Sequence, residues 1–175
     1  MSFTPIVGTL AYLLDRKSGE VLLIRRNARL DDDHFGKVNG LGGKLEIGEH
    51  VLSGLRREIK EEAGVEIISA TLRGTIAWTD FGPRREQWLG FIFLVDAWDG
   101  EFLENNDEGS LEWVPLERLI NACDPDPEVR SRANLPLWEG DRYFIPLIFD
   151  SDPRCFHGSM PYDGNEFKDW IYERH

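Results

Sequence analysis

The sequence predicts an α+β fold, a modest mixed β-sheet with helices packed on it. Short apolar runs bounded by turn residues predict strands, whereas residues 49–63 repeat their apolar positions with the period of an α-helix. The chain has 175 residues, the length of one domain, and it shows neither an internal repeat nor a low-complexity linker. We therefore expect a single domain over residues 1–175.

Four segments read as strands. They cover residues 6–14, 21–24, 67–78 and 88–97. The first two form a predicted hairpin around the turn at 15–20, and the last two are joined by a loop at 80–85. Between the pairs, residues 27–43 are polar and rich in glycine. Three adjacent side chains cannot converge on one metal ion, so we expect Asp31–Asp33 to form a solvated loop.

The clearest helix is predicted over residues 49–63, where apolar side chains recur at positions 51, 52, 55, 59 and 63. Turning each residue by about 100° places Leu52, Leu55, Ile59 and Ala63 on one apolar face. Gly64 supplies the stop signal directly after this helix.

Shorter helices are expected in the second half of the chain, over 116–122 and 143–149, although Pro146 disfavours the latter. The Asp-Pro-Asp-Pro-Glu run at 124–128 predicts a loop, which we expect to extend to residue 134. His157, in a Phe-His-Gly segment read as a turn, is expected to be structural.

The charge of the chain limits its partners. Thirty-two acidic and 20 basic residues leave a formal net charge of −12, the wrong sign for binding duplex DNA or an anionic membrane through the general field. No apolar run is long enough to span a membrane, and the start lacks the pattern of a signal peptide. Cys123 and Cys155 are too few for a disulfide framework. We expect reduced thiols in a cytoplasmic protein, a monomer or a homodimer.

Three carboxylates gather on one flank of the helix over 49–63. Glu58, Glu61 and Glu62 stand at i, i+3 and i+4, where like charges repel. Such a cluster favours a counter-charge, and hard divalent cations prefer oxygen ligands. An ordinary acidic helix face is the alternative. The glycine-rich run Gly40-Leu41-Gly42-Gly43-Lys44 lies just ahead and lets the backbone pass close to a bound group.

Together these residues form one extended motif. Residues 43–65 read G-x5-E-x7-R-E-U-x-E-E-x-G-U, where U is a bulky aliphatic residue, with the defined positions at Gly43, Glu49, Arg57, Glu58, Ile59, Glu61, Glu62, Gly64 and Val65. The motif resembles the signature of the Nudix hydrolases at every defined position. The resemblance extends over most of the chain, and it implies the Nudix α/β/α sandwich, in which a mixed sheet lies between helices.

The resemblance also implies a reaction. Nudix enzymes hydrolyse a nucleoside diphosphate linked to another moiety, using Mg²⁺, or Mn²⁺, held by the glutamates of the motif. The implied metal ligands are Glu58, Glu61 and Glu62, with the carbonyl of Gly42 as a further candidate. Arg57 is expected to support the ligand geometry and counts among the catalytic candidates with Glu61; a plain surface charge is the alternative for Arg57.

A further carboxylate precedes the Trp-Val-Pro segment at 113–115. In relatives the acid five residues before that tryptophan reaches the metal site, and here this acid is Glu108. The resemblance implies that Glu108 is an additional metal ligand or the base for the attacking water. A solvated loop acid is the alternative.

Two segments resemble the branch of MutT-type 8-oxo-dGTP diphosphatases. One contains Asn39, with Val38 where many members have tryptophan; the other is Leu-Pro-Leu-Trp-Glu-Gly-Asp-Arg at 135–142. The implied base-pocket residues are Asn39, Trp138, Asp141, Arg26 and Thr9. Gly140 replaces the first of two aspartates of the animal enzyme, so that enzyme's breadth across oxidised guanine and adenine does not carry over. The alternatives are a turn residue for Asn39, core packing for Trp138, a helix N-cap for Asp141 and plain strand for Thr9.

The sequence thus predicts a Mg²⁺-dependent enzyme that hydrolyses oxidised purine nucleoside triphosphates, such as 8-oxo-dGTP, to the monophosphate and pyrophosphate. The partner is then a small nucleotide. Two alternatives remain open: a Nudix hydrolase of another substrate, such as another dNTP, ADP-ribose or an RNA 5′ end, and a non-catalytic Nudix ligand sensor. Sensors often lose glutamates of the motif, whereas this chain keeps all of them.

Overall fold

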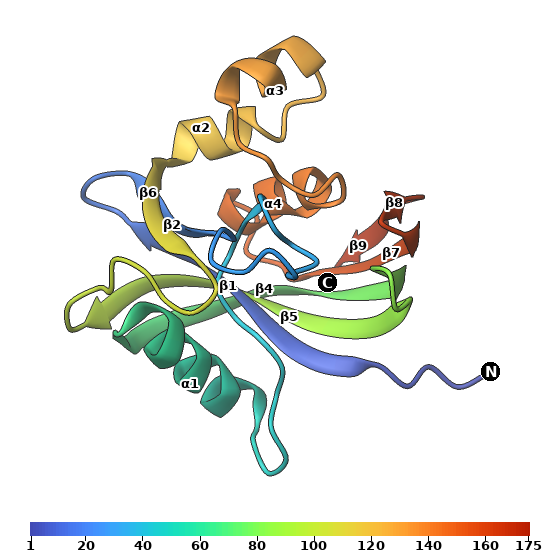
Figure 1. Cartoon of the computed structure of the whole chain (residues 1–175), viewed down its shortest axis with the longest axis horizontal. Coiled ribbons are helices and arrows are strands. Elements are labelled where there is room, and N and C mark those ends of the chain that lie inside the picture. The colour runs from blue at the N-terminus through green and yellow to red at the C-terminus, as the bar shows by residue number, and fades with distance from the viewer.

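The computed structural model describes residues 1–175, which form a nine-stranded mixed sheet with four helices (Figure 1). The strands are β1 (Ile6–Asp15), β2 (Glu20–Arg25), β3 (Val38–Asn39), β4 (Glu66–Phe81), β5 (Glu86–Asp99), β6 (Ser110–Pro115), β7 (Phe156–Gly164), β8 (Glu166–Phe167) and β9 (Ile171–Arg174). Their order is β3-β2-β1-β5-β4-β7-β8, with β6 beside β2 and β9 beside β7. β1 pairs with β5, and β4 with β7, in parallel, and the other pairs are antiparallel.

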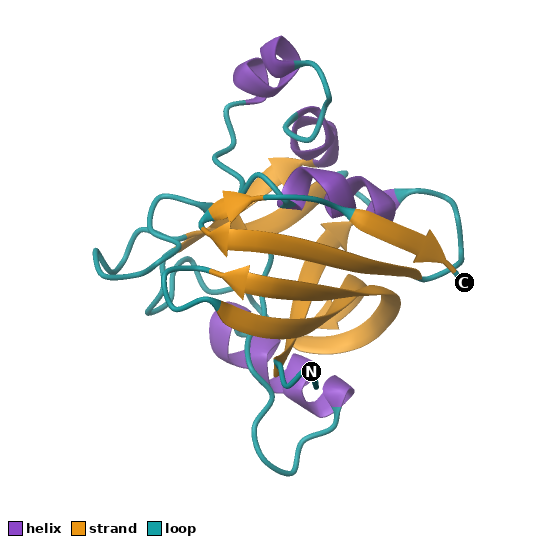
Figure 2. Ribbon diagram, turned by 90° about the vertical axis from the view of Figure 1, so that its right-hand side faces the viewer, coloured by secondary structure: helices purple, strands orange, loops and turns teal.

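Helices cover both faces of the sheet. The helices are α1 (Val51–Ala63), α2 (Leu116–Asn121), α3 (Pro127–Ala133) and α4 (Asp141–Phe149). Figures 1 and 2 show α1 on one side and the other three on the opposite side. Successive side chains of β1 point to opposite faces of the sheet. Leu13 packs with α1 on one face, and Tyr12 packs with α4 on the other. The predicted α/β/α arrangement is confirmed.

Local capping sets the start of α1. The imidazole of His50 accepts a hydrogen bond from the Ser53 amide, and the Ser53 hydroxyl in turn accepts one from the His50 amide. The helix therefore begins at Val51, two residues later than predicted, and Glu49 lies outside it. Gly64 ends α1 with φ +82°, as expected. Leu52 was placed on the buried face, but its side chain is exposed; the buried apolar face is Leu55, Ile59 and Ala63.

The structure corrects several boundaries. Asp80 and Phe81 belong to β4, so the expected loop at 80–85 is only a turn at 82–85. The expected loop at 124–134 contains α3, because Asp126 caps its N-terminus and Pro127 takes its first position. α4 begins at Asp141 and tolerates Pro146 in its interior.

The segment around His157 also differs from its prediction. Residues 156–158 form the start of β7 rather than a turn. They pair with residues 74–76 of β4, and His157 lies opposite Thr75. His157 is exposed, and a ring nitrogen bonds the hydroxyl of Thr75 at 2.8 Å. Both cysteine thiols are free, and no helix is long and apolar enough to cross a membrane.

Candidate active site

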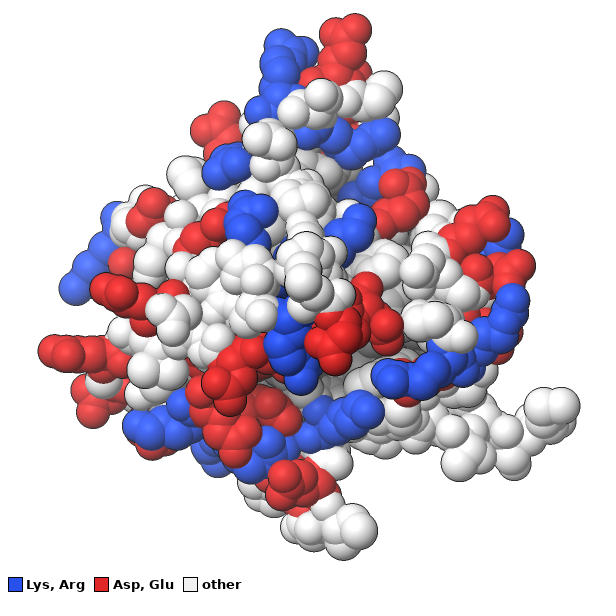
Figure 3. Space-filling view, in the orientation of Figure 1, with Lys and Arg blue, Asp and Glu red and all other residues white.

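One large cavity joins the motif to the distant base-pocket candidates. Its volume is about 690 Å³, and it is lined from β1, the segment between β2 and α1, the ends of β4 and β5, and the residues ahead of α4. Glu58 and Glu108 line one part of it, and Trp138 and Asp141 another. Basic side chains line it as well, namely Arg26, Arg29, Lys44 and Arg84. Figure 3 shows acidic and basic side chains interspersed on the face in view. The lining of the cavity also contains both kinds, so the net charge of the chain does not describe its surroundings.

Arg57 connects the acidic residues of the motif. Its guanidinium donates to both oxygens of Glu49 at 2.7 and 3.0 Å, to Glu58 at 2.9 Å and to Glu61 at 3.2 Å. A fifth hydrogen bond reaches the carbonyl of Lys44 at 3.0 Å. The ion pair with Arg57 lowers the pKa of Glu49 to about 2. Arg57 is therefore no isolated surface charge: it ties the loop before α1 to the carboxylates on the helix.

Glu62 is buried and is fixed by the glycine-rich loop. Its Oε2 accepts a hydrogen bond from the amide of Gly42 at 2.8 Å. Gly42 has φ +146°, and a Cβ there would lie 2.1 Å from the carbonyl oxygen of Thr9. A Cβ on Gly43 would lie 2.6 Å from Oε1 of Glu58. Both glycines are needed, because the loop passes against β1 and the helix with no room for a side chain.

Glu108 is brought to α1 by a residue that the sequence reasoning missed. Asn106 accepts a hydrogen bond from the Glu108 amide at 2.8 Å and donates one to the carbonyl of Glu62 at 3.0 Å. Glu108 is half-buried and pairs with Arg26, which also pairs with Asp32 at 2.7 Å. Asp32 was expected in a solvated loop, but its side chain is only 5% exposed because of this pair.

The electrostatics of the cluster test whether it suits a cation. Burial, and then the charge of Glu108, raise the pKa of Glu62 well above its usual value. Burial likewise raises the pKa of Glu58. No three acidic, imidazole or thiol side chains already converge at metal-ligand geometry, and Glu61 is largely exposed, beside Arg57. The carboxylates nevertheless fit a divalent cation, since Glu108 contributes to the raised pKa of Glu62 and Glu62 forms no ion pair.

The other end of the cavity has aromatic walls and unpaired polar atoms. Trp138 meets Phe81 edge-on at 5.3 Å, and the buried Tyr162 meets Phe81 at 4.9 Å. Thr9 Oγ1 and Asn39 Oδ1 are buried without a hydrogen-bond partner. Buried polar atoms are normally paired, so two orphaned oxygens on the residues lining one cavity indicate a site for a polar ligand.

Asp141 lies at the same end. It is the first residue of α4, but Gly140 is the N-cap and no side chain caps this helix, so the N-cap alternative for Asp141 is wrong. Burial raises the pKa of Asp141 to about 7. Of the predicted base-pocket residues, Arg26 stands apart, since its guanidinium is held by Asp32 and Glu108. The sequence reasoning gave no role to His34, Phe81 and Tyr162, which also line the cavity.

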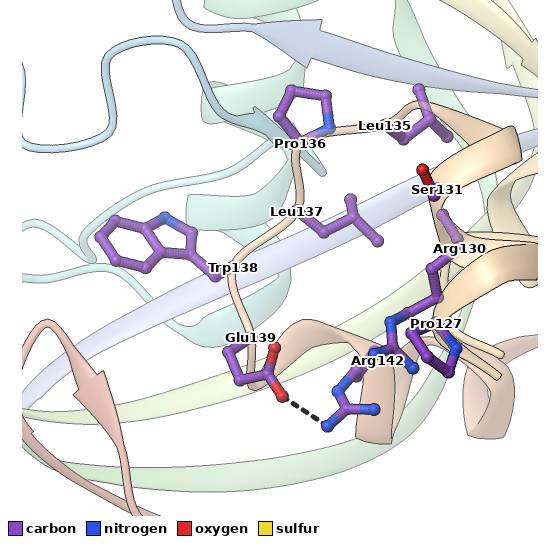
Figure 4. A pocket seen from close by; sticks show the side chains of 10 residues that line it. Pro127, Arg130, Ser131, Leu135, Pro136, Leu137, Trp138, Glu139 and Arg142 are labelled. Atoms are coloured by element: carbon purple, nitrogen blue, oxygen red, sulfur yellow. Dashed lines mark ion pairs between the residues drawn. The ribbon is translucent and has the colours of Figure 1, made fainter. Parts of the chain in front are cut away.

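A second, smaller cavity of about 250 Å³ lies on the far side of the segment 135–139. Figure 4 shows Arg130 and Arg142 together there, with the indole of Trp138 pointing away from them. Arg142 pairs with Glu139, and Arg130 donates to the carbonyls of Asp124 and Pro125. These internal contacts explain the cationic side chains without a ligand.

Comparison with known proteins decides the family. The model of the NUDIX domain matches residues 4–138, which include the motif, the glycine-rich loop and Trp138. The chain belongs to the Nudix hydrolases. The resemblance predicted from residues 43–65 is thereby confirmed, and the carboxylate cluster on α1 is part of a hydrolase that cleaves the pyrophosphate bond of nucleotide derivatives.

This Nudix hydrolase has relatives of mixed description. It is 33% identical over 131 residues to an oxidized purine nucleoside triphosphate hydrolase of Danio rerio, which covers 75% of this chain and 73% of that protein. It is 28% identical over 123 residues to the uncharacterized Nudix hydrolase YvcI of Bacillus subtilis, 69% of either chain. The crystal structure of the MutT protein from Bacillus halodurans matches 96% of this chain and 97% of its own with a TM-score of 0.75 at 24% identity, which supports the fold.

Proposed function

We propose that this Nudix hydrolase cleaves oxidised purine nucleoside triphosphates, such as 8-oxo-dGTP, to the monophosphate and pyrophosphate, and so removes damaged nucleotides from the pool. One observation carries the proposal: a single cavity of about 690 Å³ connects Glu58 of the motif and Glu108 with Thr9 and Asn39, whose side-chain oxygens are unpaired. A nucleoside triphosphate requires one end of a site that holds its phosphates, through bound cations, and another end that binds its base. The Danio rerio relative, whose described substrate is an oxidized purine nucleoside triphosphate, supports the same substrate class.

The metal-binding residues are Glu58, Glu61, Glu62 and Glu108, with the carbonyl of Gly42 as a further ligand. Mg²⁺, or Mn²⁺, bound there would polarise the phosphoryl oxygens and lower the pKa of a bound water. Glu61 needs only a change of rotamer to join the others, because its carboxylate is held by a single contact to Arg57. Arg57 acts as a positioning residue by fixing Glu58 from the side of the loop.

The chemical step is attack by water on the β-phosphorus. The bond between that phosphorus and the oxygen bridging to the α-phosphate breaks, and the products are a nucleoside monophosphate and pyrophosphate. The carboxylate of Glu108 accepts the proton of the water, with Glu61 as the second candidate for this role. Arg29 and Lys44 line the cavity and counter the charge of the phosphates, whereas the guanidinium groups of Arg26 and Arg84 are paired with acidic side chains.

At the opposite end, Asn39, Asp141 and Thr9 bind the polar edge of the base, and Trp138 and Phe81 provide aromatic walls. A carboxylate accepts from the N1–H and N2–H₂ groups of guanine, a donor pair that adenine lacks. Of the two carboxylates in the Trp-Glu-Gly-Asp segment, Glu139 pairs with Arg142 at the other cavity and Asp141 lines this one, so we expect guanine nucleotides to be preferred.

The test is a comparison of kcat/KM in the presence of Mg²⁺ for 8-oxo-dGTP, dGTP, dATP, ADP-ribose and triphosphorylated RNA. We expect a preference for 8-oxo-dGTP over dGTP of about tenfold or more, which is about 1.4 kcal/mol in transition-state binding. Faster turnover of ADP-ribose or RNA would refute the substrate while keeping the family's reaction. Absence of turnover on the whole panel would refute the proposed substrate and favour another substrate of the family or a ligand sensor.

A further inference from the structure

His34 occupies a place in the base pocket that the proposed function has not used. It lies in the loop between β2 and β3 and lines the large cavity. Its ring packs against Phe81, with centroids 6.0 Å apart, and meets Trp138 edge-on at 5.6 Å. Its backbone is held by Asp32 Oδ1, which accepts from the His34 amide at 3.0 Å, and by the amide of Lys37, which donates to the His34 carbonyl at 2.9 Å. The ring therefore has a fixed place between two aromatic walls.

The hydrogen bonds of this ring decide where its proton is. The indole Nε1–H of Trp138, which can only donate, reaches Nδ1 of His34 at 2.9 Å. Nδ1 must therefore be the unprotonated nitrogen, and the proton of the neutral ring lies on Nε2. Burial, and then the charge of Arg26, lower the pKa of His34, which agrees with a neutral ring.

The same lone pair orients Asn39. A side-chain atom of Asn39 lies 3.4 Å from His34 Nδ1. An acceptor nitrogen there requires the amide N–H₂ of Asn39 to face it, which leaves Asn39 Oδ1 as the orphaned oxygen. The pairing of Asn39 with Ile24 in the sheet holds the Asn39 backbone in place. The side-chain amide can therefore respond to His34 only by rotating to exchange its oxygen and nitrogen. His34 thus determines which atom of Asn39 is free for a ligand.

We propose that His34 is a positioning residue that sets the hydrogen-bonding pattern of the base pocket, an inference that rests on the proposed nucleotide substrate. The pocket then presents two acceptors, Asn39 Oδ1 and the carboxylate of Asp141, and one donor, His34 Nε2–H, which makes no hydrogen bond within the protein. The N1–H, N2–H₂ and O6 groups of a guanine-type base supply two donors and one acceptor. An adenine edge supplies a single donor group, so the pattern selects guanine-type bases.

Two substitutions of His34 distinguish the effect of its hydrogen-bonding nitrogens from the effect of its aromatic ring. His34→Phe keeps an aromatic ring between Phe81 and Trp138 but removes both the Nδ1 acceptor and the Nε2–H donor. In His34→Asn the side-chain oxygen takes a position close to that of Nδ1 and can still accept from Trp138. His157→Phe is the matched control, because His157 is exposed on β7 and lies outside the cavity.

The first measurement is made on the free protein by ¹H–¹⁵N NMR. Long-range correlations of the His34 ring should show Nε2 protonated and Nδ1 unprotonated. The indole N–H signal of Trp138 should shift in His34→Phe and stay close to its position in His157→Phe. A His34 ring protonated on Nδ1, or a Trp138 signal that does not respond to His34→Phe, would overturn the inference without any assay of activity.

The second measurement is the ratio of kcat/KM for 8-oxo-dGTP to that for dATP, at about pH 8.5, where the carboxyl of Asp141 is ionised. We expect His34→Phe, which loses both the acceptor and the donor, to lower this ratio by about tenfold. His34→Asn keeps the acceptor but lacks the Nε2–H donor, so its ratio should lie between those of His34→Phe and the wild type. An unchanged ratio in His34→Phe would remove the role of His34 and leave the proposed function intact. A wild type that does not distinguish the two nucleotides would refute both.

Discussion

At the scale of residues, the site combines buried carboxylates that form no ion pair with polar atoms that lack a hydrogen-bond partner. Glu62 illustrates the first kind: it is buried, its only hydrogen-bond donor is the Gly42 amide, and burial together with Glu108 raises its pKa. Asn39 Oδ1 illustrates the second kind. Unpaired groups of this kind destabilise a fold, and their location around one cavity is explained when they serve a ligand.

The carboxylates can be tested without disturbing the fold. Glu62→Gln retains an oxygen that can accept from the Gly42 amide but loses the charge, so we expect kcat to fall by about a hundredfold or more while the unfolding temperature stays the same or rises. Glu61→Gln should lower kcat similarly. Glu66→Gln is the control, because Glu66 is exposed and pairs only with Lys60. Turnover at the wild-type rate in both Glu61→Gln and Glu62→Gln would contradict the metal assignment.

Asp141 predicts a particular pH dependence of stability. Burial raises the pKa of its carboxyl from 3.8 to about 7 in the folded protein. Between these values the folded state binds more protons than the unfolded state, so this group lowers the free energy of unfolding as pH rises, by at most about 1.4 kcal/mol per pH unit. Asp141→Asn lacks this titration.

We therefore expect the free energy of unfolding of Asp141→Asn, relative to wild type, to increase between about pH 5 and about pH 8. Urea denaturation at both pH values measures it. Asp99→Asn provides the control, since Asp99 is an exposed residue at the end of β5. A difference between Asp141→Asn and wild type that is the same at both pH values would show that the Asp141 carboxyl is not desolvated.

At the scale of elements, the sequence predicted α1 but not α3, because different kinds of signal in the sequence encode the two helices. α1 has thirteen residues and a buried stripe that repeats with the helical period, and such a signal is legible in a sequence. α3 has only seven residues, and it depends on Asp126 accepting from the Glu128 amide and on Pro127 at its first position. In composition an Asp-Pro-Asp-Pro run suggests a loop, yet Asp followed by Pro is also a start signal for a helix.

The cap of α3 can be measured directly. Asp126→Ala removes the side chain that accepts from the Glu128 amide, and we expect a loss of about 1 kcal/mol in the free energy of unfolding. Asp126→Asn should restore most of it, because asparagine caps helices equally well. Thermal unfolding of the three proteins gives the comparison. Equal stability of Asp126→Ala and wild type would mean that α3 contributes nothing to the cooperative unit.

The limits of prediction from the sequence follow the same division. The hairpin of β1 and β2, helix α1 and its glutamates were predictable because their signals lie within a few residues of one another. β7 was not, because its register is set by β4, which lies far away in the chain. In the site, His34, Phe81 and Asn106 were missed for the same reason: their roles come from contacts with Trp138, Tyr162 and Glu62 that only the fold creates.

At the scale of the whole molecule, the sheet carries one core on each of its faces, and the cavity opens where the loop after β2, the loop ahead of α1 and the start of α4 meet. α1 supplies carboxylates from one side of the sheet. From the other side, the segment ahead of α4 supplies Trp138, and the first residue of α4 is Asp141. The site thus depends on both cores. A ligand that binds only to the intact site therefore stabilises the entire fold.

Divalent cations should therefore stabilise the protein. A ligand that binds only the folded state at 100 times its Kd adds about 2.7 kcal/mol to the free energy of unfolding. We expect Mg²⁺ to raise the Tm, EDTA to reverse the rise, and Glu58→Gln/Glu62→Gln to abolish it. The Glu66→Gln variant should respond like wild type. An equal rise of Tm in the double variant would place the cation elsewhere on this acidic surface.

The parallel pairing of β4 with β7 has a consequence during synthesis of the protein on the ribosome. Gly74 pairs with Phe156, 82 positions later in the chain. At about 5–20 residues per second, a ribosome needs roughly 4–16 s to make the intervening segment. During that time β4 presents a long row of unpaired backbone groups to other nascent chains. The growing polypeptide is thus most open to aggregation in the interval before its last strands emerge, when the helix that carries the motif has already been made.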